Sequence, residues 1–153
     1  MGLLRFHLSI PCRDLEETQA WYVEGLGCTA GRRSEQALIL ALGGHQLVAQ
    51  LMPRSRSEPQ QSSEPQQTGI YPRHFGLVFA TAQPWQALLE RARAQGLRFG
   101  VEPKCRFRAQ PLEHHTFFLI DPSGNWLEFK HYQDPEAALG RQECPEVGDA
   151  EWR

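Results

Sequence analysis

The stretch from Asp121 to Phe129, DPSGNWLEF, combines a turn with a short apolar strand that carries one carboxylate. Asp, Pro, Ser and Gly are residues that tight turns select, so DPSG predicts a turn. Side chains alternate along a strand, which places Trp126, Glu128 and Lys130 on one face. A carboxylate on the inner face of a sheet is costly unless it is paired or bound to a cation. Glu128 therefore predicts a cation nearby.

The residues before this stretch have the order strand, helix, strand, strand. Residues 72–80 alternate as a strand, and residues 83–96 have the apolar spacing of a helix that Gly96 ends. Two further strands are expected at 97–101 and 114–121. With the strand after the DPSG turn, the second half of the chain has the order β-α-β-β-β.

The first half of the chain repeats this order. A strand is expected at 4–12, a helix that starts at Asp14, and a short strand at 28–33. Residues 35–52 contain two apolar runs around Gly43-Gly44, which is typical of a hairpin. An internal repeat of this kind indicates one supersecondary unit used twice. The sequence therefore predicts an α+β fold of two β-α-β-β-β modules, with His7 and His74 at equivalent places on their first strands.

Length and composition indicate one domain. The chain has 153 residues, of which 41% are apolar, and this is enough for a shared core. We expect a single domain over residues 1–133, with module 1 at 3–52 and module 2 at 70–133. Residues 53–69 are rich in Pro, Ser, Gln and Glu and are expected to form an exposed linker. The polar tail at 134–153 is expected to be peripheral, with one short helix near PEAALG.

Several classes of protein do not fit this composition. The formal net charge of −2 argues against a nucleic-acid partner. No apolar run approaches the roughly 20 residues that span a bilayer, and the N-terminus lacks the pattern of a signal peptide. The four cysteines form no CxxC pair, which favours reduced thiols and a cytoplasmic location.

Four motifs in this order resemble the vicinal oxygen chelate superfamily: FHLSIPCRDL at 6–15, WYVEGLGC at 21–28, RHFGLVF at 73–79 and DPSGNWLEFK at 121–130. That superfamily includes glyoxalase I, fosfomycin-resistance enzymes, bleomycin-binding proteins and extradiol dioxygenases. The resemblance extends from residue 4 to about residue 132. It implies that the two modules form an open half-barrel cup with a divalent metal on its concave face.

The resemblance also implies a set of metal ligands. His7, His74 and Glu128 match the family's ligand positions, and Gln50 matches a weaker fourth position. Two imidazoles and a carboxylate suit Fe, Mn, Ni, Co, Zn or Mg. The alternative is a metal-free cup in which both histidines are hydrogen-bonded.

In that alternative, Glu128 forms an ion pair with Lys130, Arg5 or Arg73. The same face would then need no metal to neutralise the carboxylate.

Further polar residues lie near the penultimate strand. His114 and His115 are adjacent, so they must face opposite sides, and the one that faces the cup could be a general acid or base. Lys104, Arg106 and Arg108 alternate, so they are expected to share a face. That face could bind an anionic group, or it could simply be solvated.

Three functions follow as hypotheses. The first is a metal-dependent enzyme of the glyoxalase type, in which the metal stabilises an oxyanion of a small oxygenated metabolite. The second is an Fe(II) ring-cleaving dioxygenase, since two histidines and a carboxylate form its facial triad. The third is a metal-free drug- or metabolite-binding protein. The expected partners are a small molecule and a second copy of the chain, with the modules paired within one chain or across a swapped dimer.

Overall fold

The computed structural model describes residues 2–52, 67 and 69–148. The first module holds one four-stranded sheet with the strand order β1-β4-β3-β2. β1 and β4 are parallel, and the other neighbours are antiparallel. Its elements are β1 (His7–Cys12), α1 (Leu15–Gln19), the π-helical η1 (Ala20–Gly25), β2 (Thr29–Arg33), β3 (Ala37–Leu42) and β4 (His45–Leu51).

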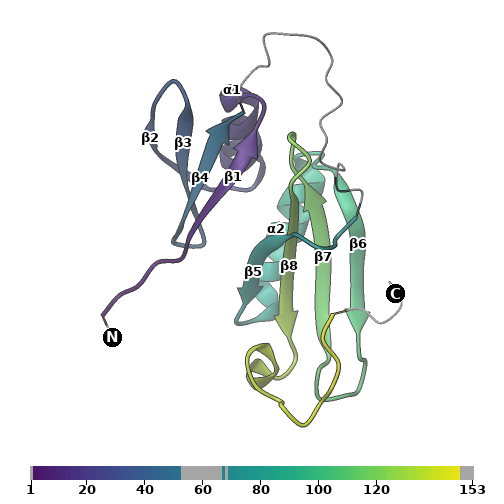
Figure 1. The fold of residues 1–153 in the computed structure, drawn as a ribbon. Helices are drawn as coiled ribbons and strands as arrows, with labels where there is room; N and C mark the ends of the chain where they lie inside the picture. The colour runs from purple at the N-terminus through teal and green to yellow at the C-terminus, as the bar shows by residue number, and fades with distance from the viewer. Residues whose placement is uncertain (1, 53–66, 68, 149–153) are drawn as a thin grey trace.

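The second module repeats this arrangement with the strand order β5-β8-β7-β6 (Figure 1). Its elements are β5 (Phe75–Phe79), α2 (Ala82–Ala94), β6 (Phe99–Arg106), β7 (His114–Ile120), β8 (Trp126–Tyr132) and the 3-10 helix η2 (Pro135–Ala138). The predicted α+β fold of two β-α-β-β-β modules is therefore confirmed.

A helix covers one face of each sheet. Side chains along a strand therefore alternate between the face that the helix covers and the opposite face. In β4, Leu47 and Ala49 are buried, whereas Gln46 and Gln50 point to the other face. In the second module, Trp85 of α2 packs on the sheet and donates a hydrogen bond of 2.8 Å to the carbonyl of Phe129. Buried side chains of both modules belong to one core, as one domain requires. The faces opposite the helices are available for a site.

Some element boundaries differ from the prediction. β1 begins at His7 rather than at residue 4, and Leu3, Leu4 and Phe6 are exposed. The first helix does start after Asp14, whose side chain caps it, but it widens into a π-helix at Ala20. An apolar spacing does not distinguish these two helix types.

The strand β6 is longer than predicted and ends at a sharp change of backbone direction. Phe107 has φ of 51°, in the left-handed region that non-glycine residues rarely adopt. The alternation of the strand therefore stops at Arg106, and Arg108 lies in the following turn.

The predicted linker at 53–69 lies outside the described residues apart from positions 67 and 69, so its exposure stays a prediction. In the described part of the chain, no helix has the length and apolar character needed to cross a membrane.

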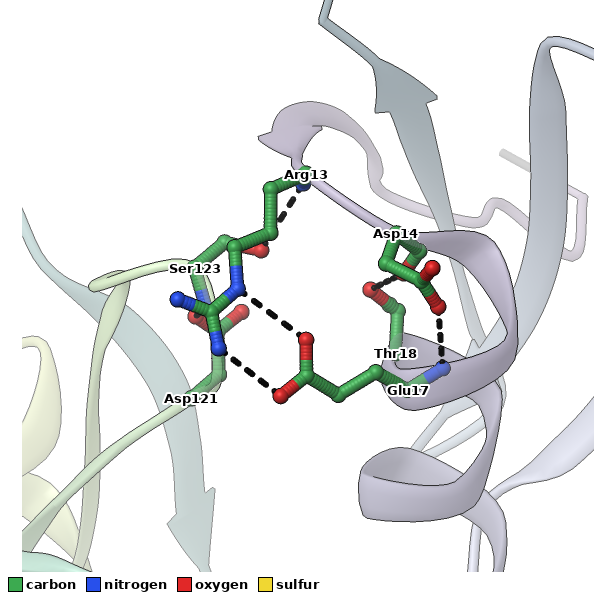
Figure 2. Close-up of polar contacts among 6 residues, drawn as sticks. All are labelled: Arg13, Asp14, Glu17, Thr18, Asp121 and Ser123. Carbon is green, nitrogen blue, oxygen red and sulfur yellow. Dashed lines mark hydrogen bonds and ion pairs between the residues drawn. The ribbon is translucent and has the colours of Figure 1, made fainter.

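The two modules are joined at the corner after β1 and at the DPSG turn (Figure 2). The backbone N–H of Arg13 donates to Ser123 Oγ at 3.1 Å. In addition, Asn125 Nδ2 donates to the carbonyl of Pro11 at 3.0 Å. The Tyr22 hydroxyl donates to Asp121 Oδ2 at 2.8 Å in a buried position. The turn thus holds the modules together as well as reversing the chain.

Candidate functional site

A histidine and a carboxylate meet on the face of the second sheet that α2 does not cover. His74 lies just before β5, and its Nε2 is 3.3 Å from Oε2 of Glu128 on β8. The other ring nitrogen, Nδ1, lies 2.6 Å from the carbonyl oxygen of Ile70. A carbonyl only accepts, so Nδ1–H is the donor and Nε2 is directed at the carboxylate.

Glu128 is held ionised by its surroundings. Thr116 Oγ1 donates to Oε1 at 2.8 Å, and Lys130 Nζ lies 3.5 Å from Oε2. Burial alone would raise the pKa of Glu128, but the His74 hydrogen bond, the Lys130 charge and the Thr116 hydrogen bond lower it to about 2. The cationic partner expected for Glu128 is present, and within this chain it includes Lys130.

His7 has the same hydrogen-bonding pattern on the other sheet. Its side chain is exposed on β1, and its Nδ1 lies 2.7 Å from Oε1 of Gln46. An amide oxygen only accepts, so Nδ1–H donates and Nε2 keeps its lone pair. Gln46 was not singled out in the sequence. In the parallel pairing of β1 with β4, Gln46 lies opposite His7, and this pairing is the feature that identifies Gln46 as the partner of His7.

The register of the two sheets shows which residues are equivalent. Ser9 lies opposite Val48 in the first module, and Gly76 lies opposite Glu128 in the second. Since Ser9 and Gly76 each follow the predicted histidine by two residues, Val48 occupies the position of Glu128. Gln50 then occupies the position of Lys130. The register therefore does not support Gln50 as the counterpart of the ligand carboxylate.

A single chain brings together only part of the predicted metal site. His74 and Glu128 are in contact, whereas His7 is bonded to Gln46 on the first sheet. Among the residues that the structure describes, no group of three or more His, Cys, Asp or Glu side chains is placed to hold a metal ion. Within the described part of one chain, His7 thus forms no such group with His74 and Glu128, and the convergence of the three stays a prediction.

The adjacent histidines of β7 face opposite sides, as predicted. The ring of His114 lies 4.8 Å from that of Tyr132, on the face that carries Thr116 and Glu128. Burial lowers the pKa of His114, so its ring is neutral near neutral pH. His115 faces α2 instead.

His115 stacks on His131 at 5.1 Å between ring centroids, and its ring lies 5.9 Å from that of Trp85. Of the two candidate catalytic histidines, His114 is therefore the one on the same face of the sheet as Glu128.

Two of the three basic residues that were expected to share a face, Lys104 and Arg106, lie on the face of Glu128. Lys104 lies opposite Thr116 across the β6–β7 ladder, and Arg106 lies opposite His114. Residues directly opposite each other in an antiparallel pair point to the same side of the sheet. The prediction for Lys104 and Arg106 is confirmed. The prediction for Arg108 is wrong, because the strand ends before it.

Comparison with known proteins identifies relatives of this chain. Residues 5–129 match the family model of the Glyoxalase/Bleomycin resistance protein/Dioxygenase superfamily. A glyoxalase/bleomycin resistance protein/dioxygenase structure from Alicyclobacillus acidocaldarius is 41% identical, with a TM-score of 0.74, and the match covers 87% of this chain and 94% of that one. No curated protein matches the sequence.

Two more distant structures share the fold. A fosfomycin resistance protein from Listeria monocytogenes is 13% identical, with a TM-score of 0.64 and coverage of 90% of this chain and 99% of that one. Lactoylglutathione lyase from Agrobacterium tumefaciens is 15% identical, with a TM-score of 0.62 and coverage of 86% and 94%. At these identities the likeness concerns the fold alone.

Proposed function

Since the chain belongs to the glyoxalase/bleomycin resistance protein/dioxygenase superfamily, we propose that it is a metal-dependent enzyme of the glyoxalase type, which acts on a small oxygenated metabolite. His74 and Glu128 of one chain would hold the metal together with His7. Gln50 stays the weaker candidate for a fourth ligand, since the register aligns it with Lys130.

The orientation of the two histidines carries the proposal. In both His7 and His74, Nδ1–H donates to an oxygen acceptor, so Nε2 is the ring nitrogen left to bind a metal. In His74 this nitrogen faces the Glu128 carboxylate at 3.3 Å and donates to it when protonated, so a metal would take the place of that proton. Metal-binding histidines are oriented in this way, because the second hydrogen bond selects the tautomer and raises the basicity of the ligating nitrogen. The carboxylate of Glu128 would supply an ionised oxygen ligand, since its surroundings lower its pKa to about 2.

A divalent metal such as Fe, Mn, Ni, Co, Zn or Mg would supply Lewis-acid chemistry, stabilising an oxyanion on the substrate. The chain itself supplies the groups around it. Nδ1–H of His114 donates to the carbonyl of Leu112 at 2.8 Å, so its Nε2 is an acceptor. The ring of His114 is neutral and largely buried, and an imidazole of this kind can remove or hold a substrate proton.

The position of His7 supports a homodimer. His7 lies on the first sheet and, among the described residues, forms no metal-holding group with His74 and Glu128, so the third ligand would come from a second copy of the chain. β1 pairs only with β4 and β5 only with β8, which leaves both as edge strands in the described chain. Unpaired edges are usually covered. Val78 of β5 is 52% exposed and Phe6 is 64% exposed, so apolar area is available beside both edges.

A second function, a metal-free binding protein, is favoured by one specific observation. Lys130 already lies 3.5 Å from the Glu128 carboxylate, so the charge of Glu128 is balanced without a metal.

The four cysteines are free thiols, which agrees with a cytoplasmic location for either function.

Metal analysis of protein purified without chelator tests the proposal. About one equivalent of a divalent transition metal per chain is expected for a three-ligand site. Glu128→Gln should lose this metal, whereas Glu102→Gln should keep it, because Glu102 is exposed and paired with Arg93. Wild-type protein without metal, or equal metal in Glu128→Gln, would favour the binding protein instead. Oxygen uptake with a catechol would indicate the Fe(II) dioxygenase.

A further inference from the structure

The face that carries Glu128 has an excess of positive charge. Three cationic side chains lie on it, and they come from two strands, namely Lys104, Arg106 and Lys130. Lys104, Thr116 and Lys130 form one row across β6, β7 and β8, since each lies opposite the next in the ladders. Glu128 is the carboxylate that Lys130 contacts. A face of this composition attracts an anion.

A cavity adjoins this row of charges. Its floor is formed by the second module, through Phe107, Leu112, His114, Lys130 and Tyr132. Its volume is about 310 Å³, at the lower end of the roughly 300–1,000 Å³ that small-molecule sites occupy. Apart from His114, Lys130 and the hydroxyl of Tyr132, the floor is apolar, so it combines a surface for an organic group with one positive charge.

The C-terminal tail forms the other wall of the cavity. The chain turns back after β8, as the yellow segment in Figure 1 shows, and residues 137–142, Cys144 and 146–148 line the cavity. Two contacts hold the tail in place. The N–H of Gln133 donates to the carbonyl of Glu113 at 2.9 Å, and Ala137 is buried. The charged residues of this wall are Arg141 and Glu146, one of each sign. Arg141 is also paired with Asp134, so the cation that faces the cavity from the floor is Lys130.

We propose that this cavity binds the anionic end of an organic substrate, with Lys130 as the group that holds the charge. The apolar part of the ligand would lie against Phe107, Leu112 and the Tyr132 ring. Lys130 can serve this role while it contacts Glu128, because an ammonium has three donors and only one is used there. The inference rests on the proposed function, since it places the substrate beside the His74–Glu128 pair.

Calorimetric titration of chelator-treated protein tests the inference with three probes: phenylphosphonate, inorganic phosphate and the neutral benzamide. Phenylphosphonate should bind about tenfold more tightly than benzamide, because a charge-assisted hydrogen bond forms only with the anion. It should also bind more tightly than inorganic phosphate, because only its ring contacts the apolar floor. Equal binding of benzamide, or no saturable binding of phenylphosphonate, would overturn the proposal.

Two variants and a control locate the site. Lys130→Met should weaken phenylphosphonate binding about tenfold, and Arg93→Met should not, because Arg93 pairs with Glu102 away from this face. Ala138→Phe should fill the cavity and weaken phenylphosphonate but not inorganic phosphate. Equal losses in Lys130→Met and Arg93→Met would contradict the assignment. Thermal unfolding of each variant confirms that it folds.

The metal content of the same samples before chelation separates this inference from the proposed function. Lys130→Met should retain its metal, because Lys130 is not a ligand. Metal-free wild-type protein that binds phenylphosphonate through Lys130 would refute the metal proposal and leave the anion site standing. Wild-type protein that holds metal but does not bind phenylphosphonate would support the metal proposal and refute the anion site.

Discussion

The hydroxyl of Tyr22, in the helix of the first module, donates a hydrogen bond of 2.8 Å to Oδ2 of Asp121, in the turn between β7 and β8 of the second. Asp121 is 4% exposed, and its other carboxylate oxygen accepts from the N–H groups of Ser123 and Asn125. Burial, and then the nearby carboxylate, raise the pKa of Tyr22 well above its usual range, so the phenol stays a donor.

Tyr22→Phe should therefore destabilise the protein by about 1.5–3 kcal/mol, the usual worth of a hydrogen bond to a charged group. The free energy of unfolding in urea measures this. Tyr132→Phe is the matched control, since the Tyr132 hydroxyl has no hydrogen-bond partner among the described residues. Equal stability of the two variants would mean that the Tyr22–Asp121 bond does not hold the modules together.

Gly76 is required where β5 passes β8. A Cβ at this position would lie 1.7 Å from the carbonyl oxygen of Glu128, which no side chain can tolerate. Gly76→Ala should push β5 away from β8, at a cost of about 1–3 kcal/mol or more, and should separate His74 from Glu128. Urea unfolding and metal content measure the two effects. Gly69→Ala, with no atom near its Cβ, should change neither.

The internal repeat made the fold and the paired histidines predictable, because alternation and helix spacing are local properties. The assembly of the site was less predictable for a physical reason. Tyr22 and Asp121 are far apart in the sequence, and nothing local shows that they join the modules in this way. A flexible linker permits either pairing of the modules. The sequence therefore showed His7, His74 and Glu128 without showing that the described part of one chain does not gather them into one group.

The register of the strand pairing was the second feature that the sequence could not predict. Gln46, Val48 and Gln50 share one face of β4, so alternation treats them alike. Only the pairing of β1 with β4 shows that Gln46 lies beside His7 and that Gln50 corresponds to Lys130. The same limit applied to Arg108, because the positive φ of Phe107 ends the strand without a glycine or proline to mark it.

His131 should make the stability depend on pH. Burial, and then the charge of His115, lower the pKa of His131 below its ordinary value of 6.5 in the folded protein. The unfolded chain therefore binds the proton more readily. This contribution to stability is complete above pH 6.5 and is lost as the pH falls through the folded pKa.

Urea unfolding at pH 7.5 and at pH 5 should show this loss, and His131→Phe should reduce it. The comparison between variants is needed because burial also lowers the pKa of His114, while the Glu128 hydrogen bond raises that of His74 and acts in the opposite direction. An unchanged difference between the two pH values in His131→Phe would show that the stacked His115–His131 pair is not responsible.

The last prediction concerns which chain supplies His7. If the metal site is shared between two copies, His7→Ala breaks each site on one side and Glu128→Gln breaks it on the other. Each variant alone should lose its metal. When the two are unfolded together and refolded as an equal mixture, a mixed dimer would contain one site with both defects and one site with none. About half of the dimers are mixed, so about a quarter of the sites should regain metal.

If each chain instead closed its own site, every site in the mixture would keep one defect, and metal content would stay at the level of the single variants. Sedimentation of the same mixture shows whether dimers are present. Dimers without recovered metal would contradict the shared site, and so would a monomeric wild type that holds one equivalent of metal.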